Sequence, residues 1–198
     1  MDPAASLRIG CLVMAAGNAS RFGANKLAAE LDGRTLIERA LDAVPKGMFA
    51  AVCVASQYEG IEELAGKYGF AAIHNAHPDW GLSYTIRLGT QAMRACDGIL
   101  YLVADQPLLR RDSVRRIAEA WLRTPEKIAG ASHEGRRGNP NLFPARFFPE
   151  LLALEGDCGG NLVIKRHTED YLPVELAPEE LRDCDTPQEL AALRIQAE

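Results

Sequence analysis

Long apolar segments and an excess of positive charge are both absent from this sequence. No apolar run approaches the ~18 residues that span a bilayer, and residues 1–8 lack the basic-then-apolar order of a secretory signal. The net charge is −5, from 22 basic and 27 acidic side chains. A negative total disfavours general binding to nucleic acid or to anionic membranes. We therefore expect a cytoplasmic protein with no nucleic-acid or membrane partner, which would hold an anionic substrate by local cations.

Cysteine and histidine are also sparse. The five cysteines are scattered without any C-x-x-C pair, a distribution that is typical of a reducing compartment rather than of a disulfide framework. Only four histidines occur. His74 and His77 lie three residues apart, but no cysteine or further histidine stands near them in the sequence. We interpret them as loop residues that can line a site rather than as zinc ligands.

The most informative segment follows the first apolar run, residues 9–13, which predicts a buried strand of a parallel sheet. Side chains then shrink at Ala15, Ala16 and Gly17, so that backbone N–H groups can approach a ligand closely. Two cations and a second glycine follow. Bare amides with fixed positive charges are what a polyphosphate requires. The residues that we expect to bind it are Ala15, Ala16, Gly17, Arg21, Gly23 and Lys26.

A simpler interpretation of this loop is a strand–helix turn with two solvated basic residues. The loop is not a Walker motif, because Ala24 follows Gly23 where that motif has lysine. It is not the dinucleotide fingerprint either, because Gly17 and Gly23 do not make G-x-G-x-x-G. From its residues alone, the loop is a candidate phosphate site without an assigned class.

Strands and helices alternate along the rest of the chain. This order predicts one α/β domain over residues 1–198, with a mostly parallel sheet covered on both faces. Thr35 and Glu38 form a capping-box pattern that would open the first helix. We expect further strands at 49–55, 69–73, 98–104 and 127–132, and helices at 36–44, 61–68, 83–95, from Asp112 or Ser113 to 122, and from Pro187.

A second signal is the carboxylate of Asp105, directly after the apolar run that ends at Ala104. Ligands of parallel sheets bind beyond the carboxyl ends of the strands, so this group and the 15–26 loop should face one cleft. Mg²⁺ suits the position, since it binds through one or two carboxylates plus substrate phosphates. The alternative is that Asp105 caps the turn made by Gln106 and Pro107.

Taken together, these segments resemble the MobA/MocA-like nucleotidyltransferase family, closest to the molybdenum cofactor cytidylyltransferases. The loop is similar to the family's L-A-A-G-x-S-x-R-[MF]-G-x-x-K pattern, although Ala19 replaces a serine. D-Q-P at residues 105–107 is similar to its metal-binding aspartate motif. Further similar segments are residues 81–89, 138–144, 156–161 and 183–190. The segment at 156–161 departs from the pattern, because Asn161 stands where arginine is usual.

The resemblance implies a three-layer α/β/α, Rossmann-like fold of the GT-A-like nucleotidyltransferase type. It also implies that Ser83 and Thr85, at a helix start, help to bind the nucleotide through free amides, and that Asp105 and Asp185 bind Mg²⁺. The alternative for Ser83 is that it simply caps a core helix. Arg21, Lys26 and Asp105 would be the catalytic residues. A further possibility is structural: Asp185 or Thr186 would simply cap the last helix, with Pro187 in its first turn.

The reaction implied is transfer of CMP from CTP to a phosphorylated acceptor, with release of pyrophosphate. Ala16 resembles the cytidylyl members, whereas guanylyl members carry glycine there, so CTP is expected rather than GTP. The acceptor in the best-known relatives is molybdopterin, and a molybdenum hydroxylase would receive the product. The alternatives are a cytidylyl- or guanylyltransferase that uses another phosphate acceptor, and a non-catalytic carrier or chaperone of the molybdenum cofactor.

Overall fold

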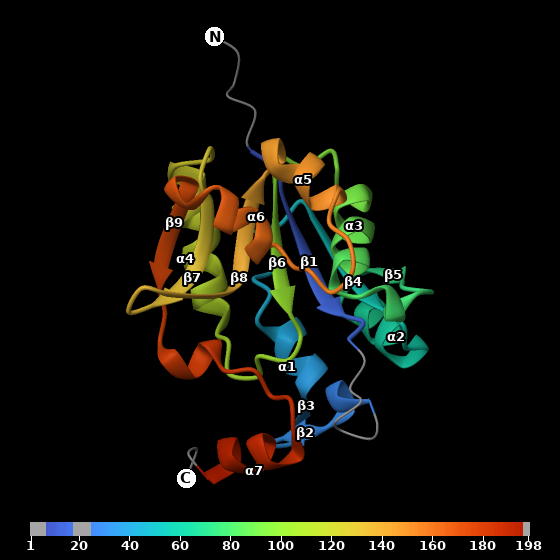
Figure 1. Ribbon diagram of the computed structural model, residues 1–198. Coiled ribbons are helices and arrows are strands. Elements are labelled where there is room, and N and C mark those ends of the chain that lie inside the picture. The colour runs from blue at the N-terminus through green and yellow to red at the C-terminus, as the bar shows by residue number, and fades with distance from the viewer. Residues whose placement is uncertain (1–6, 18–24, 196–198) are drawn as a thin grey trace.

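The computed structural model describes residues 7–17 and 25–195, and its centre is a seven-stranded sheet (Figure 1). The strand order is β5-β4-β1-β6-β8-β7-β9. The strands are β1 (Ile9–Ala15), β4 (Ala51–Ser56), β5 (Ala71–His74), β6 (Gly98–Val103), β7 (Ile128–His133), β8 (Arg136–Pro144) and β9 (Tyr171–Glu175).

Most neighbouring strands of this sheet run parallel, as predicted. The exception is β8, which pairs antiparallel with both β6 and β7. All five predicted strands are present, with ends shifted by no more than two residues. Neither β8 nor β9 was predicted, because the first half of β8 is polar and both strands contain a proline, Pro140 and Pro173, which argues against a strand.

Helices cover both faces of the sheet, which confirms the three-layer α/β/α prediction. One apolar cluster packs α1 (Leu36–Asp42), α2 (Glu59–Lys67) and α4 (Arg111–Arg123) against one face. A second cluster, on the other face, contains side chains of α3 (Leu82–Ala92), α5 (Phe148–Leu152) and α6 (Asn161–Arg166). The 3-10 helices are η1 (Lys26–Ala28), η2 (Pro78–Trp80), η3 (Ala145–Phe147), η4 (Thr168–Asp170) and η5 (Pro178–Leu181).

The N-termini of two helices show to what extent the local sequence determines where a helix begins. The capping box predicted for α1 is present: the Glu38 amide donates to the Thr35 hydroxyl at 3.3 Å, and the Thr35 amide donates to the Glu38 carboxylate at 2.8 Å. The predicted start of α4 at Asp112 or Ser113 was wrong. That helix begins after Arg110, whose amide donates to the Glu180 carboxylate at 2.9 Å. Its start is held by a distant carboxylate, which local sequence does not reveal.

A small hairpin and the last helix lie together beyond the carboxyl end of the sheet (Figure 1). Strands β2 (Glu30–Leu31) and β3 (Arg34–Thr35) form the hairpin, and helix α7 spans Pro187–Ile195. Leu31, Leu190 and Leu193 are buried in the cluster that contains α1. Segments early and late in the chain, the β2–β3 hairpin and α7, therefore pack together at the edge of the sheet where β1 and β6 end. No helix in the described part of the chain is long and apolar enough to cross a membrane.

Candidate functional site

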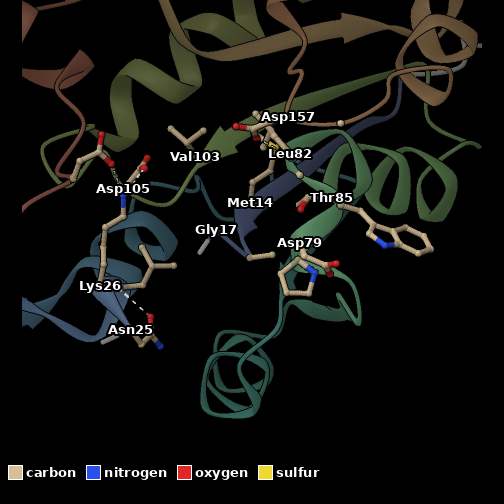
Figure 2. Close-up of a pocket in the computed structure, with 17 residues that line it drawn as sticks. Met14, Gly17, Asn25, Lys26, Asp79, Leu82, Thr85, Val103, Asp105 and Asp157 are labelled. Carbon is tan, nitrogen blue, oxygen red and sulfur yellow. Dashed lines mark hydrogen bonds and ion pairs between the residues drawn. The ribbon is translucent and has the colours of Figure 1, made fainter. Parts of the chain in front are cut away.

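A cavity of about 620 Å³ opens at the carboxyl ends of β1 and β6 (Figure 2). Its lining includes residues of the 15–26 loop, the start of α3, Asp105, the 156–157 loop and Asp185. His74, which lies in β5, and His77 do not line it, so the expectation that they line the site was wrong. The lining residues are Met14, Ala16, Gly17, Asn25, Lys26, Leu27, Pro78, Asp79, Trp80, Gly81, Leu82, Thr85, Val103, Asp105, Gly156, Asp157 and Asp185.

One end of the cavity holds a lysine between two carboxylates. Lys26 comes from η1, Asp105 follows β6, and Asp185 precedes α7. The Lys26 ammonium donates to Asp105 at 2.9 Å and to Asp185 at 2.7 Å. The position of Lys26 is set by Asn25, which caps η1 by accepting from the Leu27 amide at 3.1 Å. Three segments far apart in the sequence thus converge on one nitrogen atom.

This arrangement keeps Lys26 charged. Burial of the side chain acts to lower its pKa, but the charge of Asp105 and the hydrogen bonds to both carboxylates outweigh that effect and raise the pKa above that of a free lysine. The pair is only partly screened by solvent, since the Lys26 side chain is 13% exposed and that of Asp105 is 27% exposed. The described part of this end of the cavity therefore carries one cation and two anions.

The two carboxylates fit a divalent metal ion. Oxygen atoms of Asp105 and Asp185 already meet at one cation, the Lys26 ammonium. Hard carboxylate oxygens are the ligands that Mg²⁺ and Mn²⁺ prefer. In the described part of the chain the Asp105 side chain bonds to Lys26 and to no amide of the following turn. The donor set is thus suited to a metal, and the turn-cap alternative for Asp105 is not supported.

The opposite end of the cavity is the start of α3. Gly81 has φ +83°, and a Cβ on it would lie 2.5 Å from the Gly156 carbonyl oxygen. The Leu82 amide donates to Asp157 at 3.3 Å, and the Ser83 amide donates to Gly156 at 3.3 Å. These amides are engaged by the 156–157 loop, so the expectation of free amides at this helix start was wrong for both.

The two hydroxyl residues predicted here are placed differently. Ser83 is fully buried, does not line the cavity, and its hydroxyl has no partner within the described ranges. Thr85 does line the cavity, and its hydroxyl oxygen accepts from the Asn75 amide at 3.0 Å. The orientation of that amide is settled by the His77 N–H, which can only donate and does so to Asn75 Oδ1 at 3.0 Å. The Thr85 proton is therefore free to point elsewhere, including toward a ligand.

Aromatic side chains border this end. Trp80 lines the cavity, is 49% exposed, and stacks on His77 with centroids 4.0 Å apart and planes at 7°. Tyr84 packs edge-on against Trp80 at 4.9 Å. Trp80 is held by ring neighbours in its own segment and leaves half of its surface accessible.

The remaining predicted residues divide into three groups. Ala16 and Gly17 line the cavity, whereas Ala15 is buried at the end of β1. Arg21 and Gly23 lie outside the described residues, as does the Ala19 departure. Thr186 caps α7 by accepting from the Glu189 amide at 3.2 Å, so the capping role belongs to Thr186 and leaves the Asp185 carboxylate for the cavity.

The histidines are engaged by other side chains. His74 lies 2.7 Å from a Glu62 oxygen. His167, Glu169 and Asp170 place possible ligand atoms within 4.8 Å of one another. However, His167 is 2.7 Å from Glu150, and salt bridges from Arg146 and Lys127 neutralise Asp170. His167 and Asp170 of this group thus each have a side-chain partner among the described residues.

Sequence reasoning missed several lining residues. Met14 and Val103 supply apolar wall at the ends of β1 and β6, and Asp79 and Asp157 add two carboxylates. Asp157 lies in the 156–161 segment that the family resemblance had marked. No local pattern marks Asp79, which reaches the cavity because η2 leads into α3.

Known proteins share both sequence and fold with this chain. The purine catabolism protein PucB of Bacillus subtilis (strain 168) is 28% identical over 194 residues, which cover 91% of this chain and 93% of that protein. A nucleotidyl transferase from Methanothermobacter thermautotroptrophicus superposes with a TM-score of 0.77 at 23% identity, covering 96% and 97% of the two chains. Rv0371c of Mycobacterium tuberculosis H37Rv, solved in complex with manganese, has a TM-score of 0.76 at 20% identity, over 95% and 98%.

The structural likeness shows the GT-A-like nucleotidyltransferase fold, in agreement with the strand order and layers described above. The sequence matches the family model for the MobA-like NTP transferase domain over residues 11–171, which includes the 15–26 loop, the α3 start and Asp105. This chain therefore belongs to the MobA-like NTP transferase family.

Proposed function

We propose that the protein is a Mg²⁺-dependent cytidylyltransferase that transfers CMP from CTP to a phosphorylated acceptor and releases pyrophosphate. The observation that carries the proposal is the meeting of Lys26, Asp105 and Asp185 at one end of a cavity that Ala16 and Gly17 also line. Membership of the family supports nucleotidyl transfer as the reaction class.

Each residue has a role that follows from its place. Phosphoryl-type transfer is mainly positioning and neutralisation of charge, so no covalent nucleophile is needed. The Gly17 backbone and Lys26, together with Arg21, would hold the β- and γ-phosphates and stabilise the leaving pyrophosphate. Asp105 and Asp185 would hold Mg²⁺, which supplies charge neutralisation at the α-phosphate when bound. The relative solved with manganese supports use of a divalent ion in this fold.

The nucleotide base would lie at the opposite end, against α3. The methyl group of Ala16 takes up space in the cavity that a glycine would leave open, which favours the smaller pyrimidine base over a purine. The Thr85 hydroxyl oxygen accepts from the Asn75 amide, so its proton can be donated to a ligand. Cytosine presents hydrogen-bond acceptors for it at O2 and N3. CTP is therefore the proposed substrate, with GTP as the alternative. Ser83 is not included, because its side chain is buried away from the cavity.

Molybdopterin is the proposed acceptor, and the proposal rests on the family resemblance alone. A molybdenum hydroxylase would then receive the product. The name of the B. subtilis relative assigns it to purine catabolism and does not specify an acceptor. Asn161 is exposed at the start of α6 and supplies no cation where arginine is usual. This departure favours, as a second candidate, a carrier of the cofactor or a transferase with another phosphate acceptor.

We also propose that the chain folds as a single domain and that the protein is cytoplasmic.

The test is pyrophosphate release from CTP and from GTP with Mg²⁺, with and without molybdenum cofactor. Acceptor-dependent release from CTP, faster than from GTP, would establish the proposed reaction. Release only with another phosphorylated acceptor would retain the transferase and replace the acceptor. Tight CTP binding without release in any mixture would identify the carrier and refute catalysis.

A further inference from the structure

We infer that Lys26 has a second role, as the placeholder for the divalent cation in the nucleotide-free protein. Its ammonium occupies the position between Asp105 and Asp185, and it must be drawn away by the nucleotide phosphates before a metal ion can bind there. The inference rests on the proposed function, because it takes these carboxylates to be the metal ligands.

The geometry shows that both carboxylates are already used. Lys26 Nζ lies 2.9 Å from Asp105 Oδ2 and 2.7 Å from Asp185 Oδ1, so a single ammonium bridges the two. Figure 2 shows the Lys26 side chain extended along the cavity wall with its nitrogen directed at Asp105. A metal ion that took one oxygen from each carboxylate would need the space between them, where the ammonium now lies.

The two cations exclude each other for electrostatic as well as steric reasons. A divalent ion next to a lysine ammonium would be repelled, and the Lys26 side chain is only 13% exposed, so solvent screens the repulsion poorly. Lysine carries its charge on a flexible four-carbon stem, which allows the ammonium to move without the backbone. Moving the Lys26 ammonium away from the two carboxylates therefore requires another anion that the same side chain can reach.

Among the described lining residues, the cavity offers Lys26 no other carboxylate at this end. Its other described carboxylates are Asp79 and Asp157, and Asp157 lies at the α3 end, where it accepts from the Leu82 amide. Nucleotide phosphates placed over Gly17 would supply the missing charge next to η1. The nucleotide thus releases the carboxylates, and Mg²⁺ and CTP should bind cooperatively, each weakly without the other.

The experiment measures Mn²⁺ binding to nucleotide-free protein by the loss of the free-ion electron paramagnetic resonance signal. If Lys26 occupies the site in nine-tenths of molecules or more, the apparent affinity of wild-type protein is reduced by about tenfold or more. Lys26→Met and Lys26→Gln should therefore bind Mn²⁺ at least about tenfold more tightly than wild type. Lys67→Met, at an exposed lysine that ends α2, should bind like wild type.

A second substitution tests that the ion binds at this site. Asp105→Asn introduced into Lys26→Met should abolish the gained affinity, with thermal unfolding used to confirm that each variant is folded. Equal or weaker Mn²⁺ binding by both Lys26 variants would overturn the inference, and so would a gain that survives Asp105→Asn. Because the readout uses no nucleotide and no turnover, it separates this inference from a failure of the proposed reaction.

Discussion

At the scale of single residues, Asp105 is the side chain on which the proposed chemistry depends most. It bridges to Lys26 at 2.9 Å and lies where β6 ends in the cavity. Asp105→Asn keeps the shape and removes the charge, so we expect Mg²⁺-dependent pyrophosphate release to fall by at least about 100-fold, the scale seen when one electrostatic group is removed from an active site. Steady-state kinetics on folded protein would measure it.

The matched control is Asp112→Asn, an aspartate with a 74% exposed side chain in the first turn of α4. It should leave the rate unchanged. Wild-type turnover and an ordinary metal dependence in Asp105→Asn would remove Asp105 from the mechanism.

Gly81 tests the other end of the cavity. With φ +83° and the Gly156 carbonyl 2.5 Å from the position of a Cβ, Gly81→Ala should push the 156–157 loop away from α3. We expect a loss of about 1–3 kcal/mol in the free energy of unfolding and weaker nucleotide binding. Urea unfolding and CTP titration would measure the two effects.

Gly66→Ala is the control for Gly81→Ala. Gly66 lies inside α2 with open space around its Cβ position, so alanine there should stabilise the protein by about 0.5–1 kcal/mol. Equal effects of the two substitutions would contradict the steric argument.

At the scale of elements, the capping box of α1 links helix stability to pH. Hydrogen bonds from the Thr35 backbone and side chain lower the pKa of Glu38. A carboxyl whose pKa is lowered on folding stabilises the folded state above its unfolded pKa, and this contribution is lost as the pH falls through the folded value. Thr35→Ala should therefore cost about 1 kcal/mol at pH 7 and less at pH 3.

Urea unfolding at the two pH values would measure this difference. Glu63→Ala, at an exposed position of α2, should show no such pH-dependent gap relative to wild type. A cost of Thr35→Ala that is the same at pH 3 as at pH 7 would contradict the role given to Glu38.

At the scale of the whole molecule, the position of Asp185, a proposed metal ligand, depends on how the last helix packs against the early part of the chain. Asp185 precedes α7, and Leu193 of that helix is 3% exposed in the cluster that also contains Leu31 and Leu36. Leu193→Ala should destabilise the protein by about 2–5 kcal/mol. Because α7 anchors Asp185, the Leu193→Ala substitution should also weaken metal binding in the presence of CTP.

The exposed Gln188 of the same helix supplies the control. Gln188→Ala should change neither stability nor metal affinity by a measurable amount. If Leu193→Ala lowered stability and left metal affinity at the wild-type value in folded protein, Asp185 would not depend on the packing of α7.

Much of the architecture was predictable because it depends on local sequence patterns. Short, mostly apolar runs that alternate with segments of helical periodicity indicate the buried parallel strands. The Thr35–Glu38 capping-box pattern predicts the start of α1. The small residues at 15–17 and the acid after β6 also indicate a ligand site, since the carboxyl ends of neighbouring parallel strands share one edge. Local chemistry and strand direction together determine these features.

Other features depended on contacts between distant segments. β8 is a strand because β6 and β7 flank it, despite its polar half and Pro140. The amides at the start of α3 are taken by Gly156 and Asp157, more than seventy residues away. No local pattern encodes such partners.

The sequence by itself determined the fold class, the family and which residues we propose for phosphate binding, because strand periodicity and short motifs act over a few neighbouring positions. Only the tertiary structure decided that Ser83 is withdrawn while Thr85 reaches the cavity, and that Lys26 lies between Asp105 and Asp185. Those facts depend on how η1, β6 and the segment before α7 meet in space. Electrostatic attraction over 2.7–2.9 Å acts between neighbours in the fold, which can be 79 or 159 positions apart in the chain.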